Sequence, residues 1–218
     1  MKFEDQRDIM VQTQICRRGI NDQRVLDAFL VVPRHEFVPH DMRTYSYSDH
    51  PLSIGEGQTI SQPYIVALML DLLQVRPTDH VLEIGAGSGY QTALLAKLAA
   101  EVYAVERIDS LMQHAKRLLR QLGYGNIHFR TGDGTRGWEK AFPPRDAFDR
   151  IIVAAGSPQV PQPLINQLAE GGRLVIPSGT RLAQELLLVT RRDGEILIEK
   201  HGGCAFVPLI GEEGWPDA

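Results

Sequence analysis

A glycine-dense segment follows directly after the apolar stretch of residues 81–84. Gly85, Gly87 and Gly89 alternate there with small residues, and a helix-like pattern begins at once behind them. Glycine adopts positive φ angles and leaves no side chain between the backbone and a ligand. A strand, a turn and a helix in this order are typical of a nucleotide site at the carboxyl edge of a sheet. A purely structural tight turn is the alternative interpretation.

Two carboxylates accompany this turn. Glu106 ends the next apolar stretch, about 20 residues beyond Gly85, where a carboxylate can accept hydrogen bonds from both ribose hydroxyls of a nucleotide. Glu83 lies just before the turn, where its negative charge disfavours a pyrophosphate and favours a sulfonium or ammonium group. An ordinary surface glutamate at a strand end is the alternative for Glu106.

The glycine spacing distinguishes two classes of nucleotide cofactor. A dinucleotide turn has the pattern Gly-x-Gly-x-x-Gly, and its helix N-terminus binds a pyrophosphate. Here the third glycine comes one residue early, and the bulky Tyr90 follows it. The segment instead resembles motif I of the class I S-adenosylmethionine-dependent methyltransferases. Asp133, between Gly132 and Gly134, resembles the acid of that family that contacts the adenine amino group, and a plain turn is the alternative.

Helical and strand patterns alternate from Pro63 onward, and these elements must position the turn. The periodicity predicts helices over residues 64–73, 91–98 and 111–122 and near 163–168. It predicts strands over residues 81–84, 102–105, 127–130, 148–154, 173–176, 185–190 and 195–201. We therefore expect an α/β fold with a doubly wound, mostly parallel, Rossmann-like sheet and antiparallel C-terminal strands.

The first 62 residues are expected to form a helical and loop cap that is not an independent domain, and residues 63–218 the cofactor-binding domain. Apolar residues recur at helical intervals between Met10 and Phe29, and Asn21 and Asp22 are expected to cap a second helix. Residues 45–62 are rich in turn-forming residues and are predicted to be irregular. We expect the cap to lie over the active site.

Composition argues against several other classes of protein. The 218 residues carry a net charge of −4, whereas a non-specific nucleic-acid binder usually has a basic face. No apolar run approaches the roughly 18 residues that span a bilayer, and the polar N-terminal residues do not resemble a signal peptide. Cys16 and Cys204 lack metal-binding spacing, and the histidines are scattered. We expect a cytoplasmic monomer without a metal, a nucleic-acid partner or a membrane partner.

Two segments before the sheet resemble protein-L-isoaspartate O-methyltransferase. They are residues 32–39 and residues 55–63, and the second contains the hexapeptide Gln-Thr-Ile-Ser-Gln-Pro. The resemblance continues through residues 85–91, 106–107, 132–134, 171–177 and 206–209. It implies methyl transfer from S-adenosylmethionine to the free α-carboxylate of L-isoaspartyl residues in damaged proteins and peptides. The ester then cyclises to a succinimide, whose hydrolysis returns some normal aspartate.

The resemblance also implies roles for individual residues. Ser61 and Thr59 are the expected catalytic residues, which hold the acceptor carboxylate as hydroxyl donors. The expected cofactor-binding residues are Gln58, Ile60, Glu83, Gly85, Gly87, Ser88, Gly89, Glu106, Arg107, Asp133 and Gly134. The expected wall of the peptide groove consists of Phe206, Val207, Pro208 and Leu209, for which a core edge strand is the alternative.

Other functions share some of these features. A small-molecule or RNA methyltransferase would have the cofactor motifs but not the hexapeptide, and the glycine spacing disfavours a nicotinamide oxidoreductase. A serine hydrolase would need a Gly-x-Ser-x-Gly elbow, which is absent around Ser61. Two local alternatives stay open, namely that Ser61 only caps the helix near Pro63 and that His35 and Asp49 form an acid–base pair. A binding module without activity would not need both sets of motifs.

Overall fold

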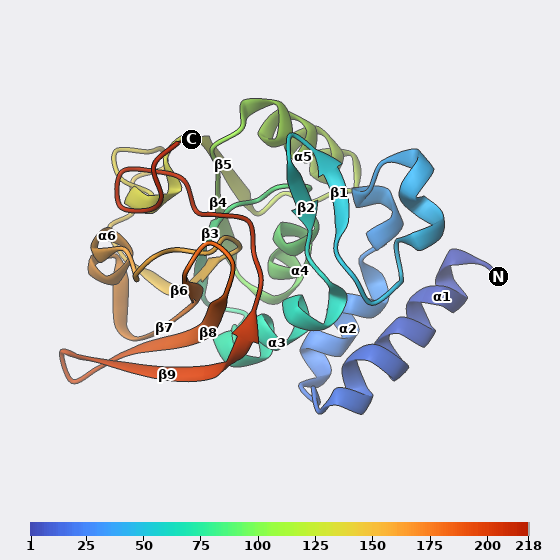
Figure 1. Cartoon of the computed structure of the whole chain (residues 1–218), viewed down its shortest axis with the longest axis horizontal. Coiled ribbons are helices and arrows are strands. Elements are labelled where there is room, and N and C mark those ends of the chain that lie inside the picture. The colour runs from blue at the N-terminus through green and yellow to red at the C-terminus, as the bar shows by residue number, and fades with distance from the viewer. Residues whose placement is uncertain (218) are drawn as a thin grey trace.

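A seven-stranded sheet forms the centre of the molecule in the computed structural model, which describes residues 1–217. Its strands are β3 (His80–Ile84), β4 (Glu101–Glu106), β5 (Ile127–Thr131), β6 (Phe148–Val153), β7 (Leu168–Gly179), β8 (Gln184–Arg192) and β9 (Glu195–Cys204). Their order is β5-β4-β3-β6-β7-β8-β9 (Figure 1). The strands from β5 to β7 pair in parallel, whereas β8 and β9 are antiparallel additions. The predicted fold class is confirmed.

Helices cover both faces of this sheet. They are α3 (Pro63–Leu73), α4 (Tyr90–Leu98), α5 (Asp109–Gln121) and the short α6 (Gln162–Asn166). Successive residues of a strand point to opposite faces. Val81 and Val102 therefore pack in one hydrophobic cluster with α3 and α4, whereas Leu82 and Tyr103 pack in another with Trp138 and the α6 residue Leu164. The strand order reverses direction at β3, and ligands of doubly wound folds bind at such a switch point.

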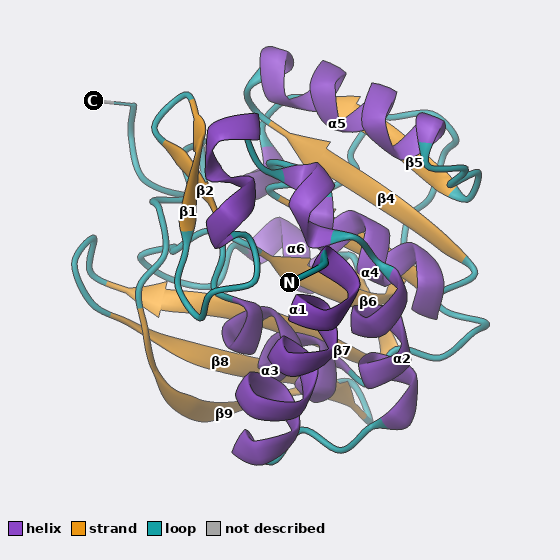
Figure 2. Cartoon of the chain, turned by 90° about the vertical axis from the view of Figure 1, so that its right-hand side faces the viewer, coloured by secondary structure: helices purple, strands orange, loops and turns teal. Residues whose placement is uncertain are grey.

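The N-terminal helices pack on one face of the sheet. They are α1 (Phe3–Met10), which continues as a π-helix (Val11–Ile15) and a 3-10 helix (Cys16–Arg18), and α2 (Gln23–Val31). Figure 2 shows them in front of the sheet beside α3 and α4. Met10 and Phe29 are fully buried in the same cluster as the α3 residue Leu70 and the α4 residue Leu94. The helices of this segment thus share a core with the sheet domain, and both the role of residues 1–62 as a cap and the domain boundary at residue 62 stay predictions.

The Asp22 carboxylate caps α2 by accepting a hydrogen bond from the backbone amide of Arg24 at 2.9 Å, as predicted. Two 3-10 helices, Arg34–Phe37 and His40–Tyr45, follow α2. The prediction of irregular structure over residues 45–62 is wrong in part, because β1 (Leu52–Gly55) and β2 (Gln58–Ile60) form an antiparallel hairpin. Only three to four residues make each strand, which is too short for alternation to be recognised.

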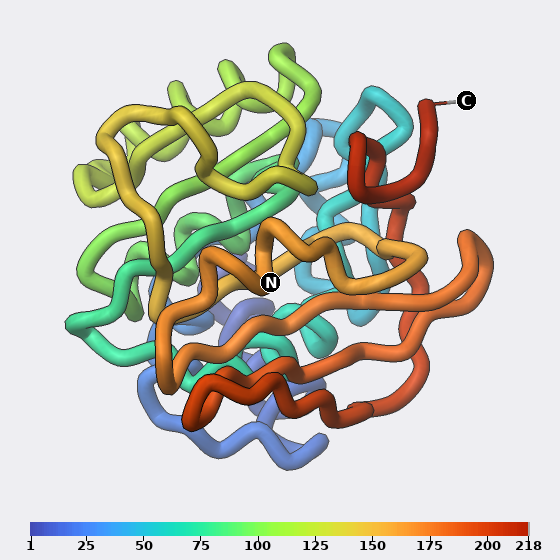
Figure 3. Tube along the Cα trace, turned by 90° about the vertical axis from the view of Figure 1, so that its left-hand side faces the viewer, coloured from blue at the N-terminus to red at the C-terminus, as the bar shows by residue number. Residues whose placement is uncertain are grey.

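The late strands are longer than the sequence pattern predicts. β7 begins at Leu168, which pairs with Phe148 of β6, so the predicted helix near residues 163–168 ends early. β9 forms one edge of the sheet, seen in red in Figure 3. Across residues 1–217, no helix has the length and apolar character needed to cross a membrane. The same residues bring no group of three or more His, Cys, Asp or Glu side chains into an arrangement suited to a metal ion.

Candidate active site

The glycine turn connects β3 to α4 through three positive φ angles. Gly85, Gly87 and Gly89 have φ angles of 88°, 53° and 85°, so the expected backbone conformation is present. The turn is fixed against the end of β4, because the amides of Gly85 and Ala86 donate hydrogen bonds to the carbonyl of Val105 at 2.8 and 3.2 Å. The backbone of this turn is therefore held against β4, and its glycines place no side chains toward a ligand.

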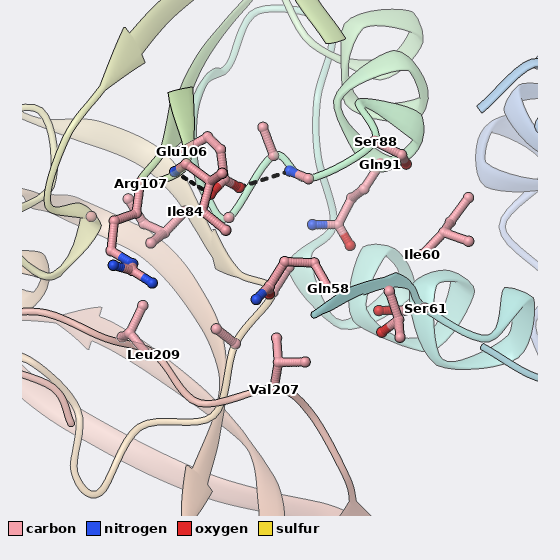
Figure 4. Close-up of a pocket in the computed structure, with 18 of the residues that line it drawn as sticks. Gln58, Ile60, Ser61, Ile84, Ser88, Gln91, Glu106, Arg107, Val207 and Leu209 are labelled. Carbon is pink, nitrogen blue, oxygen red and sulfur yellow. Dashed lines mark hydrogen bonds between the residues drawn. The ribbon is translucent and has the colours of Figure 1, made fainter. Parts of the chain in front are cut away.

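The Glu106 carboxylate lies at the carboxyl end of β4 and is 7% exposed. Its Oε2 atom accepts a hydrogen bond from the Gly87 amide at 2.9 Å, and its Oε1 atom accepts one from the Ile108 amide at 3.0 Å (Figure 4). A carboxylate offers about four acceptor positions, so two positions remain for the hydroxyls of a ribose. The geometry thus orients Glu106 without using up its acceptor capacity.

Glu83 is fully buried below the turn. The Gln91 side chain donates a hydrogen bond to its Oε1 atom at 3.2 Å. Burial raises the pKa of Glu83 to about 7, against smaller opposing effects of hydrogen bonds from Thr92 and Gln91. A neighbouring cation would favour the ionised form, so this carboxyl group suits a ligand with a positive charge.

A cavity opens beside the turn at the carboxyl ends of β3, β4 and β6, as Figure 4 shows. Most of the predicted site residues line it, namely Gln58, Thr59, Ile60, Ser61, Gly85, Gly87, Ser88, Glu106, Arg107, Gly134, Val207, Pro208 and Leu209. Segments from the hairpin, the first parallel strands and the C-terminal part of the chain therefore meet at one place. This convergence agrees with the binding position expected at a topological switch point.

Four predicted residues do not line this cavity. Glu83 lies beyond Gln91, and Gly89 faces α5, where an added Cβ would lie 3.1 Å from the side chains of Ala115 and Leu119. Phe206 lines a second cavity instead. The fourth is Asp133, whose carboxylate is described next. Direct cofactor contact by Glu83, Gly89 and Asp133 stays a prediction, as does the place of Phe206 in the wall of the peptide groove.

The Asp133 carboxylate holds its own turn and the C-terminal segment together. Its Oδ1 atom accepts hydrogen bonds from the Thr135 amide and hydroxyl at 2.8 and 2.7 Å. Its Oδ2 atom accepts one from the Glu212 amide at 2.8 Å. The backbone of Gly134 is the part of this turn that faces the cavity.

Several residues that line the cavity were missed by the sequence analysis. They are Val66, Ile84, Ala86, Tyr90, Gln91, Val105, Ile108, Ala154, Ala155 and Ile210. Gln91 had only a weak signal, because the equally polar Thr92 lies in the same first turn of α4 and does not line the cavity. Ala154 and Ile210 had none, since only the folded chain brings them to the site.

Ser61 and Thr59 lie where two cavities meet. Both residues line the cavity beside the glycine turn and also a second cavity of about 500 Å³. The walls of the second cavity include Arg18, Tyr64 and Phe206. Two ligands, one in each cavity, would thus approach each other at these hydroxyl groups.

The two alternative interpretations that the sequence left open, for Ser61 and for the pair His35 and Asp49, are wrong. The N-cap of α3 is Gln62, and no side chain caps that helix, so Ser61 is not a helix cap. His35 and Asp49 do not face each other. The His35 Nδ1 atom lies 2.7 Å from the hydroxyl of Tyr47, whereas the Asp49 carboxylate pairs with Arg18 at 3.1 Å.

Residues 5–214 match the family model described as Protein-L-isoaspartate(D-aspartate) O-methyltransferase (PCMT). The chain belongs to this family. A protein-L-isoaspartate O-methyltransferase of Petrotoga mobilis is 56% identical over 216 residues, which cover 99% of this chain and 100% of that protein. The protein of the same description from Pelotomaculum thermopropionicum is 54% identical over 213 residues, which cover 97% of this chain and 91% of that protein.

Solved structures of the family resemble the fold over nearly the whole chain. One, described as a protein-L-isoaspartate O-methyltransferase, has a TM-score of 0.83 at 30% identity and covers 95% of this chain and 67% of its own. A Plasmodium falciparum protein, described as a candidate member of the family and solved in complex with S-adenosyl-L-homocysteine, has a TM-score of 0.80 at 28% identity. That alignment covers 92% of this chain and 96% of the other.

The cavity beside the turn fits the cofactor of this family, S-adenosylmethionine. The Glu106 carboxylate offers free acceptor positions for a ribose, and the buried Glu83 suits a cationic ligand. An added Cβ at Gly134 would collide with Ile84, so the turn beside the cavity leaves no room for a side chain. An adenine ring could then lie against the backbone there.

Proposed function

We infer that the chain is a protein-repair methyltransferase, which transfers a methyl group from S-adenosylmethionine to the free α-carboxylate of L-isoaspartyl residues in damaged proteins and peptides. The membership of the family supports this function over small-molecule or RNA methylation. The observation that carries the inference within the structure is the position of Ser61 and Thr59 between two cavities. One cavity suits the cofactor, and the larger one suits the acceptor peptide.

The cofactor end of the site would be formed by backbone and carboxylate groups. Glu106 would bind the ribose hydroxyls, and the turn at Asp133 and Gly134 would bind the adenine. Gly85, Gly87 and Ser88 would approach the cofactor through their backbone. Gln58, Ile60 and Arg107 would also line its cavity, and Glu83 would lie behind Gln91. When bound, S-adenosylmethionine supplies an electrophilic methyl group on a sulfonium.

The acceptor end would need positioning groups and no general base. A carboxylate with a pKa near ~4 is ionised at neutral pH and is already nucleophilic. Hydrogen bonds from Ser61 and Thr59 would orient the acceptor carboxylate without bringing a full positive charge against it, which would reduce its nucleophilicity. Alignment of reacting groups can lower a barrier by roughly 7–11 kcal/mol, so orientation alone is an adequate task for these two hydroxyls.

The peptide groove would be the second cavity, with Phe206, Val207, Pro208 and Leu209 between it and the cofactor. Phe206 lines the groove, Val207 lines both cavities, and Pro208 and Leu209 line the cofactor side. The monomeric state, the cytoplasmic location and the lack of nucleic-acid and membrane partners stay predictions from composition.

Methyl transfer to a matched pair of peptides tests the function. Two peptides of the same sequence, one with an L-isoaspartyl and one with an L-aspartyl residue, would be incubated with tritiated S-adenosylmethionine. We expect base-labile methyl ester only on the isoaspartyl peptide, because its carboxylate is displaced by one methylene of the backbone. Equal labelling of both peptides would contradict the proposed specificity, and labelling of neither would contradict the activity.

A further inference from the structure

Arg34 is a buried cation without a counter-ion. Its side chain is 0% exposed, and no carboxylate of residues 1–217 lies within 4.0 Å of its guanidinium. The neighbouring Asp49 carboxylate pairs with Arg18 instead. Burial lowers the pKa of Arg34, but a guanidinium stays charged in proteins. A buried unpaired charge is costly, so a residue of this kind calls for a functional explanation.

The guanidinium joins segments that are distant in sequence. Its Nη2 atom donates a hydrogen bond to the carbonyl of Ser61 at 2.8 Å, and its Nε atom donates one to the carbonyl of Ser46 at 2.7 Å. Its carbon Cζ lies 4.9 Å from the ring centre of Tyr90, which lines the cofactor cavity. The planar fork of arginine fixes both carbonyls at once, so it holds the backbone of Ser61 in one orientation.

The charge also bears on the acceptor. Ser61 lies at the meeting point of the two cavities, and the positive charge of Arg34, which is buried from water, lies within hydrogen-bonding distance of the Ser61 carbonyl. A charge in such a place acts on an anion more strongly than it would in water. Because the guanidinium contacts the carbonyl rather than the cavity, it can attract a carboxylate without donating to its lone pairs. The Arg34 Nη1 atom has no hydrogen-bond partner within residues 1–217, and although the neutral Tyr90 hydroxyl and the Asp49 carboxylate act on the guanidinium from nearby, they offset its charge only in part.

We propose that Arg34 is a positioning residue for the methyl acceptor, which fixes the backbone of Ser61 and favours binding of the acceptor carboxylate through its unpaired positive charge. The inference rests on the proposed role of Ser61. Its two parts predict separate kinetic effects, because orientation of the hydroxyl acts on turnover and the charge acts on binding of the acceptor.

Two substitutions separate these parts. Arg34→Lys keeps the charge and loses the planar fork, whereas Arg34→Met loses both at similar volume. For an isoaspartyl peptide we expect Arg34→Lys to lower kcat about ten-fold to a hundred-fold, the scale of a small misplacement of reacting groups, with KM unchanged. Arg34→Met should lower kcat similarly and also raise KM about ten-fold. Calorimetry should give nearly wild-type affinity for S-adenosyl-L-homocysteine in both variants.

Arg150→Met is the matched control. Arg150 is another buried cation, 5% exposed, but it pairs with Asp79 at 3.2 Å and lies away from both cavities. This variant should lose thermal stability and keep the kinetic constants for the peptide. If Arg34→Met changed only stability, as the control does, the inference would be overturned. Equal KM values for Arg34→Lys and Arg34→Met would overturn the role of the charge.

A double mutant links the inference to Ser61. If Arg34 acts through Ser61, the losses in kcat from Arg34→Lys and Ser61→Ala should not add. Fully additive losses would overturn the positioning role. Wild-type turnover of the Ser61→Ala single variant would instead contradict the proposed role of Ser61. The Ser61 variant therefore tests the proposed function, and the Arg34 variants test the inference about Arg34. If Arg34→Met does not fold, wild-type turnover of Arg34→Lys still overturns the positioning role.

Discussion

At the scale of residues, Ser61 is placed by its neighbours rather than by its own contacts. Its carbonyl is held by Arg34, while the N-cap position of the next helix belongs to Gln62. The hydroxyl is therefore not engaged in capping α3. The hexapeptide around Ser61 predicted the residue, but nothing in the sequence connects it to Arg34, because only the fold brings the two segments together.

Replacement of this hydroxyl should separate turnover from cofactor binding. We expect Ser61→Ala to lower kcat by about 10²-fold, the lower end of the range for loss of one preorganised donor, because Thr59 remains. The affinity for S-adenosyl-L-homocysteine should change little, and kcat should stay flat above pH 6, since the acceptor is already ionised. Ser53→Ala, at an exposed position of β1 that lines neither cavity, is the control. Unchanged turnover in Ser61→Ala would remove Ser61 from the chemistry.

At the scale of elements, strands that are buried on both faces could be predicted from the sequence. Elements whose existence or bounds depend on pairing with another strand could not. Residues 81–84 form a continuous apolar run before glycines, so β3 and its turn were recognisable. The hairpin of β1 and β2 is too short for a periodic signal, and the start of β7 depends on pairing of Leu168 with Phe148. The N-terminal helices were predicted, but the sheet face on which they pack was not. An amphipathic pattern shows that one side of a helix is buried, but it does not show which element covers that side.

Two glycines with nearly equal φ angles allow backbone strain to be separated from packing. Gly89 has a φ angle of 85° and Gly123 one of 83°. An added Cβ would lie 3.1 Å from Ala115 and Leu119 at Gly89 and would meet nothing within 4 Å at Gly123. We expect Gly123→Ala to lower the free energy of unfolding by about 1–2 kcal/mol through strain alone. Gly89→Ala should lower it further, as urea denaturation would measure, and equal losses would contradict a packing role for Gly89.

At the scale of the whole molecule, one buried carboxyl group should make stability depend on pH. The pKa of Glu83 is raised from 4.5 to about 7 in the folded chain. The folded state therefore prefers the protonated form, so this contribution to stability is complete below pH 4.5 and is lost as the pH rises through about 7. Its size is about 3.5 kcal/mol, since the pKa rises by about 2.5 and each unit corresponds to about 1.4 kcal/mol.

Glu83→Gln isolates this contribution from those of other groups. The wild-type chain should lose stability relative to the variant between pH 5 and pH 8, when both are unfolded in urea at each pH. Parallel stability curves for the two proteins would show that Glu83 does not titrate in this range. The polar position of Glu83 was visible in the sequence, but its pKa was not, because burial is a property of the complete fold.

The cofactor cavity takes its walls from residues 58–61 and residues 207–210, which lie far apart along the chain. Synthesis proceeds from the N-terminus and domains generally fold as units, so the cavity has all of its walls only after residues 207–210 have been made. A chain that stops before residue 207 therefore lacks one wall of this cavity. The order in which the ribosome makes these segments therefore sets when the cofactor cavity can first be complete.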